Sequence, residues 1–143
     1  MELIRKYSDC FVCGDKNDCG LKVDFFYDQG VARAEYVPDD RFQGYKGILH
    51  GGIISSLLDE VMIKAVIAQN LLVVTAEIEV KFLKPVKIGE RLSLEGKVIE
   101  EKGRIFVAQG KACNAKKEIV AMAKGKFFKV TEEMKKILEE SLE

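Results

Sequence analysis

The residues best suited to chemistry lie in one stretch, where the only histidine precedes two glycines and an aspartate follows nine residues later. They are His50, Gly51, Gly52 and Asp59. A Gly-rich turn here opens a long apolar segment that we interpret as a helix. The free backbone amides at a helix N-terminus favour negative charge, so the pattern predicts an anion-stabilising turn with a carboxylate farther along the same helix.

Two adjacent acidic residues on this helix differ in their local partners. Glu60 has Lys64 four residues later, in the order that favours an ion pair, and we interpret it as a structural partner. Asp59 has only serines and apolar residues three and four positions away. A carboxylate without a local cation is costly to bury on an apolar helix, which makes Asp59 the candidate for chemistry.

The helix that positions Asp59 is predicted to be buried nearly all round. Its broad apolar face consists of Ile53, Ile54, Leu57, Leu58, Val61, Met62 and Ala65. Further apolar residues, Ile63, Val66 and Ile67, flank Asp59 on the opposite side. One sheet face does not provide this much cover, so we expect a symmetric dimer.

The remaining segments predict an antiparallel sheet. A hairpin over residues 21–27 and 31–37 precedes the helix, and four strand-like runs follow it at 73–84, 91–100, 105–114 and 118–130. Strict alternation in the first of these runs places Thr75 on one face and Ile78 on the other. A capped helix over 131–143 closes the chain. The order indicates an α+β fold, with a sheet around one long helix.

Composition limits the partners and the location of the protein. A chain of 143 residues is long enough for a single domain, 1–143, with a cysteine-containing loop at residues 1–20. Its 23 basic and 23 acidic side chains cancel, which argues against nucleic acid and membrane partners. No apolar run reaches the roughly 18 residues of a membrane span, so we expect a cytoplasmic protein.

The four cysteines are compatible with two interpretations, a zinc site or unligated thiols. Cys10, Cys13 and Cys19 share the N-terminal loop, and Cys113 lies far from them in sequence. The Cys-x-x-Cys spacing is compatible with zinc, but a closed site needs four ligands and only Cys113 or His50 remains. We therefore favour reduced, unligated thiols packed in a loop and expect no metal.

The motif Gly-Ile-Leu-His-Gly-Gly at residues 47–52, with Asp59 behind it, resembles hotdog-fold thioesterases of the phenylacetic-acid and 4-hydroxybenzoyl-CoA type. Residues 74–86, Gly89-Glu90 and Gly103-Arg104 fall where that family has its strand and turn signatures. The resemblance implies an antiparallel sheet wrapped around the helix. It also implies a homodimer, or a dimer of dimers, with sites at the subunit interface.

By the same resemblance, Asp59 is the catalytic carboxylate, acting as a general base on water or as a nucleophile. Gly51 supplies an oxyanion-hole amide, His50 helps to place the thioester, and Thr75 from the other subunit positions the water. Nine residues of helix separate His50 from Asp59 by about 13 Å. A reaction centre that uses both must therefore combine two subunits.

The substrate-binding candidates are Gln43, Gly44, Gly52, Lys84 and Arg104. Gly44 stands six residues before His50, where several members of the family have an asparagine that helps to hold water. Either Gln43 substitutes for it, or Asp59 and Thr75 hold the water alone. Lys84 and Arg104 are basic residues that could meet the phosphates of a nucleotide-tailed thioester, although such residues are most often solvated strand-edge charges.

These features predict an acyl-CoA thioesterase that needs no metal or other cofactor. The alternative is a non-catalytic hotdog protein that binds acyl-CoA or an aromatic ligand, which Gly44 motivates. A dehydratase on the same fold comes third, because the usual His and carboxylate signature of that activity is not the one found here. Ser55 and Ser56 lack a second histidine to serve as base, so a serine triad is excluded.

Overall fold

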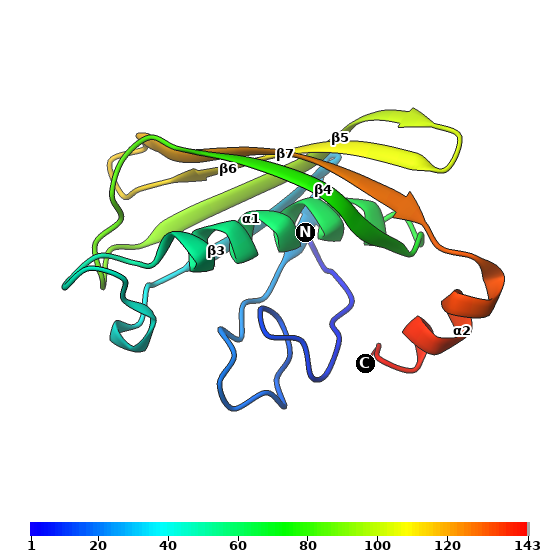
Figure 1. Ribbon diagram of the computed structural model, residues 1–143, viewed down its shortest axis with the longest axis horizontal. Coiled ribbons are helices and arrows are strands. Elements are labelled where there is room, and N and C mark those ends of the chain that lie inside the picture. Colours follow the sequence, from blue (N-terminus) through cyan, green and yellow to red (C-terminus); the bar gives the residue numbers. More distant parts are fainter. Residues whose placement is uncertain (143) are drawn as a thin grey trace.

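Seven strands form one antiparallel sheet over a long helix in the computed structural model, which describes residues 1–142 (Figure 1). The strands are β1 (Glu2–Leu3), β2 (Phe26–Asp28), β3 (Val31–Tyr36), β4 (Val73–Phe82), β5 (Leu92–Lys102), β6 (Ile105–Cys113) and β7 (Ile119–Lys129). Their order across the sheet is β1-β2-β3-β5-β6-β7-β4. The helices are a 3-10 turn η1 (Asp40–Phe42), the central α1 (Gly51–Ile67) and α2 (Glu132–Glu139). The predicted α+β arrangement is confirmed.

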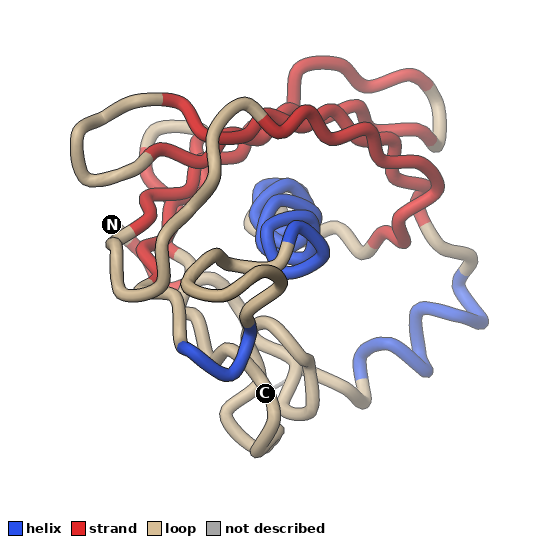
Figure 2. The backbone as a smooth tube through the Cα atoms, turned by 60° about the vertical axis from the view of Figure 1, so that its left-hand side comes forward, coloured by secondary structure: helices blue, strands red, loops and turns tan. Residues whose placement is uncertain are grey.

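The central helix is covered by the sheet on one side (Figure 2), and the N-terminal segment, blue in Figure 1, lies on its other side. Its buried residues are Ile54, Leu57, Leu58, Glu60, Val61, Met62, Lys64, Ala65, Val66 and Ile67. The Lys64 side chain is fully buried; its ammonium donates to the Arg5 carbonyl and lies 4.8 Å from the centre of the Tyr7 ring. The prediction of a helix buried on most sides is confirmed, and residues before 26 supply part of the cover.

The boundaries of the later strands agree with the sequence pattern, whereas the N-terminal region differs. The hairpin turns at Gln29 and Gly30 as predicted, but its first strand is short. Residues 21–25 instead pair with the N-terminal segment, where the Leu21 amide donates to Phe11 and the Val23 amide to Val12. This pairing joins the cysteine-containing loop to the body of the sheet.

The C-terminal helix begins as predicted and ends earlier. The Thr131 hydroxyl accepts a hydrogen bond from the Met134 amide at 3.3 Å and caps the helix. The helix ends at Glu139, and the chain then returns to the N-terminal segment, where the Ser8 amide donates to Ser141. The predicted last residue of the helix, Glu143, lies outside the described residues. No helix in residues 1–142 combines the length and the apolar composition that a membrane span requires.

A β-bulge in β4 changes which side chains face α1. Thr75 pairs with Phe127 and Glu77 pairs with Lys126, so Ala76 has no partner across the ladder. Before the bulge, the odd-numbered Thr75 faces the helix; after it, the even-numbered Ile78 packs against the core. The strict alternation expected for this strand is therefore wrong, because one extra residue reverses its parity.

Close packing between α1 and the sheet predicts a stability effect at Gly96. A β-carbon at this position would overlap the Val61 backbone carbonyl, whereas one at its cross-strand partner Gly110 would lie 3.2 Å from the flexible Met62 side chain. We expect Gly96→Ala to lower the free energy of unfolding by about 1–3 kcal/mol or more, and Gly110→Ala to lower it less. Urea denaturation of both variants checks this. Equal losses would contradict the assigned close approach.

Candidate active site

Two predicted site residues, one on α1 and one on β4, are in direct contact. The Thr75 hydroxyl, on β4, donates a hydrogen bond to Asp59 Oδ1, on α1, at 2.8 Å. Asp59 is half-buried and Thr75 is exposed. We expected Thr75 to come from another subunit; that expectation is wrong for this contact, which forms within one chain because the bulge turns Thr75 toward α1.

The surroundings of Asp59 make it a stronger base than an ordinary aspartate. Burial raises the pKa of Asp59, the hydrogen bond from Thr75 lowers it, and the nearby charge of Cys10 raises it further. The net shift is upward. A carboxyl group whose pKa is raised toward the working pH is better matched to accepting a proton from water. No cationic residue lies three or four positions from Asp59 in the sequence. Within residues 1–142, the Thr75 hydroxyl is the only hydrogen-bond donor to the Asp59 carboxylate.

A second group of predicted site residues forms the first turn of α1. His50 caps the helix, and its Nδ1 accepts a hydrogen bond from the Gly52 amide at 2.8 Å. The Ile53 amide donates to the His50 carbonyl. The amides of Gly52 and Ile53 are therefore already bonded within this first turn, although the sequence predicts free amides at this N-terminus. Gly51 is the first helical residue, and its amide donates to no acceptor within residues 1–142, so it is available to donate to a bound anion.

The loop before α1 contains Gly44, at the position where the resemblance predicts a water-holding asparagine, and its neighbour Gln43. A β-carbon on Gly44 would lie 3.5 Å from Cδ2 of His50, so this glycine packs directly beside the histidine. The Gln43 side chain accepts a hydrogen bond from the Gly47 amide at 2.5 Å and donates to the Asp40 carbonyl at 2.8 Å. Both ends of that amide are thus used in shaping the loop, which holds the Gln43 side chain against residues 40 and 47.

Within one chain, the Asp59–Thr75 pair and the first turn of α1 are far from each other. β4 runs alongside α1, so that Thr75 meets Asp59 while the Phe82 ring borders Gly51 at the other end. The remaining basic candidates also separate: Lys84 forms an exposed ion pair with Glu118, and Arg104 donates to the Lys129 carbonyl at the opposite end of β7. One chain therefore does not assemble the complete predicted site.

A cavity of about 410 Å³ opens beside the Asp59–Thr75 pair. It is lined by Tyr7, Asp9, Cys10, Ile63, Leu72, Val73, Val74, Thr75, Leu138 and Ser141. A larger cavity of about 720 Å³ lies along β2 and β3 and contains none of the predicted site residues. The smaller cavity is the candidate substrate cavity because Thr75, which bonds Asp59, is one of its lining residues.

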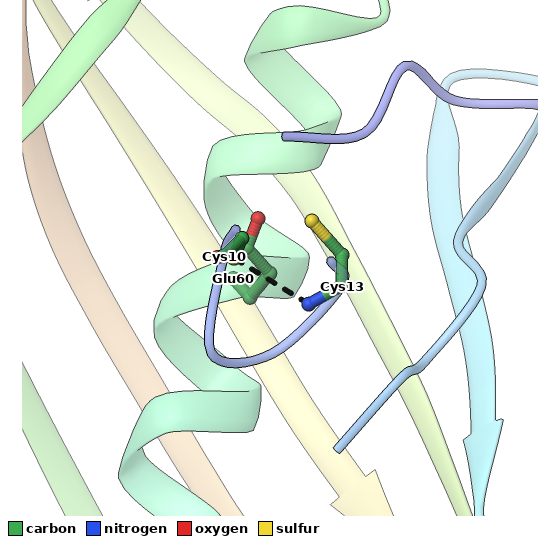
Figure 3. A group of neighbouring side chains, drawn as sticks. All are labelled: Cys10, Cys13 and Glu60. Atoms are coloured by element: carbon green, nitrogen blue, oxygen red, sulfur yellow. Dashed lines mark hydrogen bonds between the residues drawn. The ribbon is translucent and has the colours of Figure 1, made fainter. Parts of the chain in front are cut away.

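Sequence reasoning missed a cluster formed by Cys10, Cys13 and Glu60. The Cys10 sulfur lies 3.7 Å from Glu60 Oε1, and one ligand atom from each of the three residues lies within 4.8 Å of the others (Figure 3). A hydrogen bond from the Cys13 side chain lowers the pKa of Cys10, and burial raises the pKa of Glu60 to about 8. The predicted Glu60–Lys64 ion pair is confirmed at 3.8 Å. The contact between Cys10 and Glu60 cannot be predicted from a local sequence pattern, because fifty residues separate the two.

Solved structures resemble this fold. A thioesterase superfamily protein superposes with a TM-score of 0.80 and 25% identity, covering 85% of this chain and 60% of its own. A protein from Streptococcus mutans UA159, solved bound to acetyl CoA, superposes with a TM-score of 0.71 and 25% identity, covering 76% of this chain and 88% of its own. The predicted hotdog fold is confirmed.

Comparison of the sequence with known proteins finds several relatives and a matching family model. A protein from Saccharolobus solfataricus, described as a "Putative esterase", is 32% identical over 100 residues, which are 68% of this chain and 66% of that protein. A 59-residue match, 46% identical, to a methylthioribose-1-phosphate isomerase from Aquifex aeolicus covers 41% of this chain and only 12% of that enzyme. The family model of the thioesterase superfamily matches residues 46–121. The family model and the esterase relative support thioesterase or esterase activity, whereas the short match to the isomerase does not bear on it. Because the matched segment is more than half of the chain, the protein belongs to the thioesterase superfamily.

Proposed function

We propose that this protein hydrolyses acyl-CoA thioesters with Asp59 as the general base. The observation that carries the proposal is the Asp59–Thr75 pair beside a cavity of about 410 Å³. The Streptococcus mutans structure with acetyl CoA supports the choice of a CoA thioester as ligand. The reaction needs a base, an oxyanion donor and a leaving thiolate, and α1 carries a candidate for each of the first two, Asp59 and the Gly51 amide.

The chemistry follows from the two groups. A water molecule held by Asp59 and Thr75 attacks the thioester carbonyl carbon, and Asp59 takes one proton from it. The carbonyl oxygen becomes an oxyanion, which accepts a hydrogen bond from the Gly51 amide; losing one such donor typically costs about 2.7–4 kcal/mol of activation free energy. Collapse of the intermediate breaks the carbon–sulfur bond. The products are a carboxylic acid and a thiolate, and the proton on Asp59 returns to solvent or to the thiolate.

A dimer would bring the two groups together. β4 lies at the edge of the sheet and, within residues 1–142, pairs only with β7. Exposed apolar side chains, Val74, Phe82 and Leu83, lie on or just after this strand. Two-fold pairing along β4 would cover them and place two copies of α1 in opposite directions. Asp59 of one subunit would then approach the Gly51 amide of the other, and a dimer of dimers remains compatible with the exposed faces.

The phosphates of the nucleotide end would meet basic residues at the sheet ends. Lys84 and Arg104 are exposed, and each keeps contact with an acceptor in the chain. We assign Lys84 to the end of β4 near Gly51, where the Phe82 ring borders the helix. A charge on this rim would add affinity for a polyanionic tail without taking part in bond breaking.

A hydrolysis screen over acyl-CoAs of different chain length and aromatic content tests the function. Released thiol is measured with a chromogenic disulfide, and binding of each compound is measured in parallel by calorimetry. We expect hydrolysis of at least one CoA thioester. Binding without hydrolysis across the whole panel would overturn the enzyme and favour the non-catalytic alternative, which the bonded Gln43 side chain and Gly44 motivate.

The Thr75 hydroxyl is expected to contribute through the water and through Asp59. Thr75→Val keeps the shape of the side chain and removes the donor, whereas Thr75→Ser keeps the hydroxyl. We expect the valine variant to lose roughly tenfold in kcat/KM, equivalent to about 1.4 kcal/mol for one hydrogen bond to a charged group, and the serine variant to stay near wild type. Steady-state kinetics on the best substrate checks this. Equal loss in both variants would point to packing rather than to the hydroxyl.

A further inference from the structure

The Cys10–Cys13 loop and Glu60 form a cluster that the hydrolysis mechanism does not use. The two cysteines lie on a tight turn of the N-terminal segment, on the side of α1 away from the sheet, and Glu60 extends from the helix to meet them (Figure 3). Cys13 is buried and Cys10 is half-buried. Cys19 is exposed, and it does not belong to this cluster within residues 1–142.

We propose that Cys10, Cys13 and Glu60 bind a Zn²⁺ ion. Zinc binds thiolate at about 2.3 Å and carboxylate oxygen at about 2.1 Å, so the edge of a tetrahedron between them is about 3.6 Å long. The Cys10 sulfur and Glu60 Oε1 are 3.7 Å apart. The donor set contains two soft sulfurs, which favours zinc over magnesium or calcium.

An unpartnered oxygen on Glu60 is the second, independent observation. Its side chain is 9% exposed, and Glu60 Oε2 is buried without a hydrogen-bond partner in the described residues. The Lys64 ammonium lies 3.8 Å away, beyond the distance of a hydrogen bond. Leaving a buried carboxylate oxygen unpaired is costly, and coordination of the carboxylate to a metal ion offsets that cost.

The buried charges balance when the ion is present. Two thiolates and one carboxylate carry three negative charges, and Zn²⁺ with the Lys64 ammonium carries three positive charges. Lys64 is 0% exposed, so its charge must be compensated inside the protein. The ammonium thus neutralises the anionic metal centre without being a ligand.

The backbone of the loop also suits bound thiolates. The Cys13 amide donates to the Cys10 sulfur at 3.4 Å, and the Gly14 amide donates to the Cys10 carbonyl at 2.9 Å. A β-carbon on Gly14 would overlap the Ser8 carbonyl, so only glycine permits this close turn. Three protein ligands leave one position of a tetrahedral zinc, which we assign to water because Cys10 borders the cavity that contains Thr75. The ion would fix the N-terminal loop to α1 beside Asp59.

Metal titration of the reduced full-length protein, stripped with a chelator, tests the proposal independently of any hydrolysis. Zn²⁺ affinity is measured against a chromophoric chelator, and Co²⁺ serves as a spectroscopic substitute. We expect one equivalent per chain, with thiolate-to-cobalt charge-transfer absorption and the intense visible bands of a tetrahedral ion. Cys10→Ser and Cys13→Ser should weaken binding by more than the roughly 10–100-fold typical of an outer-shell change. Glu60→Gln should weaken it by at least about tenfold.

Matched cysteine controls make the result specific. Cys19→Ser and Cys113→Ser should keep wild-type affinity and an unchanged cobalt spectrum, since neither sulfur belongs to the cluster. Circular dichroism checks the fold of every variant, and the wild-type cobalt spectrum decides the thiolate ligation even where a variant does not fold. Absence of thiolate charge transfer in wild type, equal loss in Cys19→Ser and Cys10→Ser, or an unchanged affinity in Glu60→Gln would overturn the proposed site.

Discussion

Asp59→Asn is expected to lower kcat/KM for thioester hydrolysis by about 10²–10⁴-fold, the range that a positioned general base contributes. This corresponds to roughly 2.7–5.4 kcal/mol of lost transition-state stabilisation. The asparagine keeps an oxygen that can accept the Thr75 hydrogen bond, so the local contact survives while the base is lost. Steady-state kinetics on the best acyl-CoA of the panel measures the effect.

Glu101→Gln is the matched control for this substitution. Glu101 is an exposed acidic residue on β5, which β6 and β7 separate from β4 and the proposed subunit interface. The same loss of one negative charge at this position should leave kcat/KM near wild type. Comparable losses in both variants would mean that Asp59 acts through net charge, and an active, folded Asp59→Asn protein would remove it from the role of base.

Mixing two inactive variants is expected to restore about a quarter of wild-type activity if each site uses two subunits. One variant is Asp59→Asn and the other is Gly51→Pro, which removes the amide that the oxyanion needs. Gly51 is the first residue of α1, a position where proline fits a helix. Random exchange makes about half of the dimers mixed, and each mixed dimer carries one intact site and one doubly damaged site.

Native mass spectrometry verifies that the subunits have exchanged, and circular dichroism verifies that each variant is folded. The matched control is a mixture in which both subunits carry Asp59→Asn, which should remain inactive. If mixed dimers form and activity does not return, every site lies within one subunit. Light scattering that shows an active monomer would lead to the same conclusion.

Much of the fold follows from local patterns in the sequence. The runs after α1 alternate between apolar and polar residues and are separated by turns that contain Gly89, Gly103 and Lys117, all with positive φ. These patterns predict the ends of β5, β6 and β7 close to where the structure has them. The sequence predicts residues 21–25 as part of the hairpin, and this is wrong because an extended apolar segment satisfies a strand pattern whichever partner it pairs with. Here the partner is an irregular loop.

The candidate site was only partly predictable for a related reason. Asp59 can be chosen over Glu60 from helical spacing alone, since Lys64 lies one turn after Glu60. The parity change at Thr75 cannot be read from the strand, because apolar residues occur at both odd and even positions around the bulge. The contact between Cys10 and Glu60 depends on how an aperiodic loop packs against a helix, and no periodicity encodes it.

The bulge in β4 also bears on how related chains should be aligned and shortened. Ala76 is the extra residue, so removing it would straighten the strand and exchange the faces of the side chains on one side of the deletion. The threonine would remain in the sequence while its hydroxyl turned away from Asp59. A homologue one residue shorter here would need its hydroxyl-bearing side chain at a neighbouring position to make the same bond. In an alignment of this strand, the presence or absence of the bulge residue therefore decides whether a threonine at this position can reach Asp59.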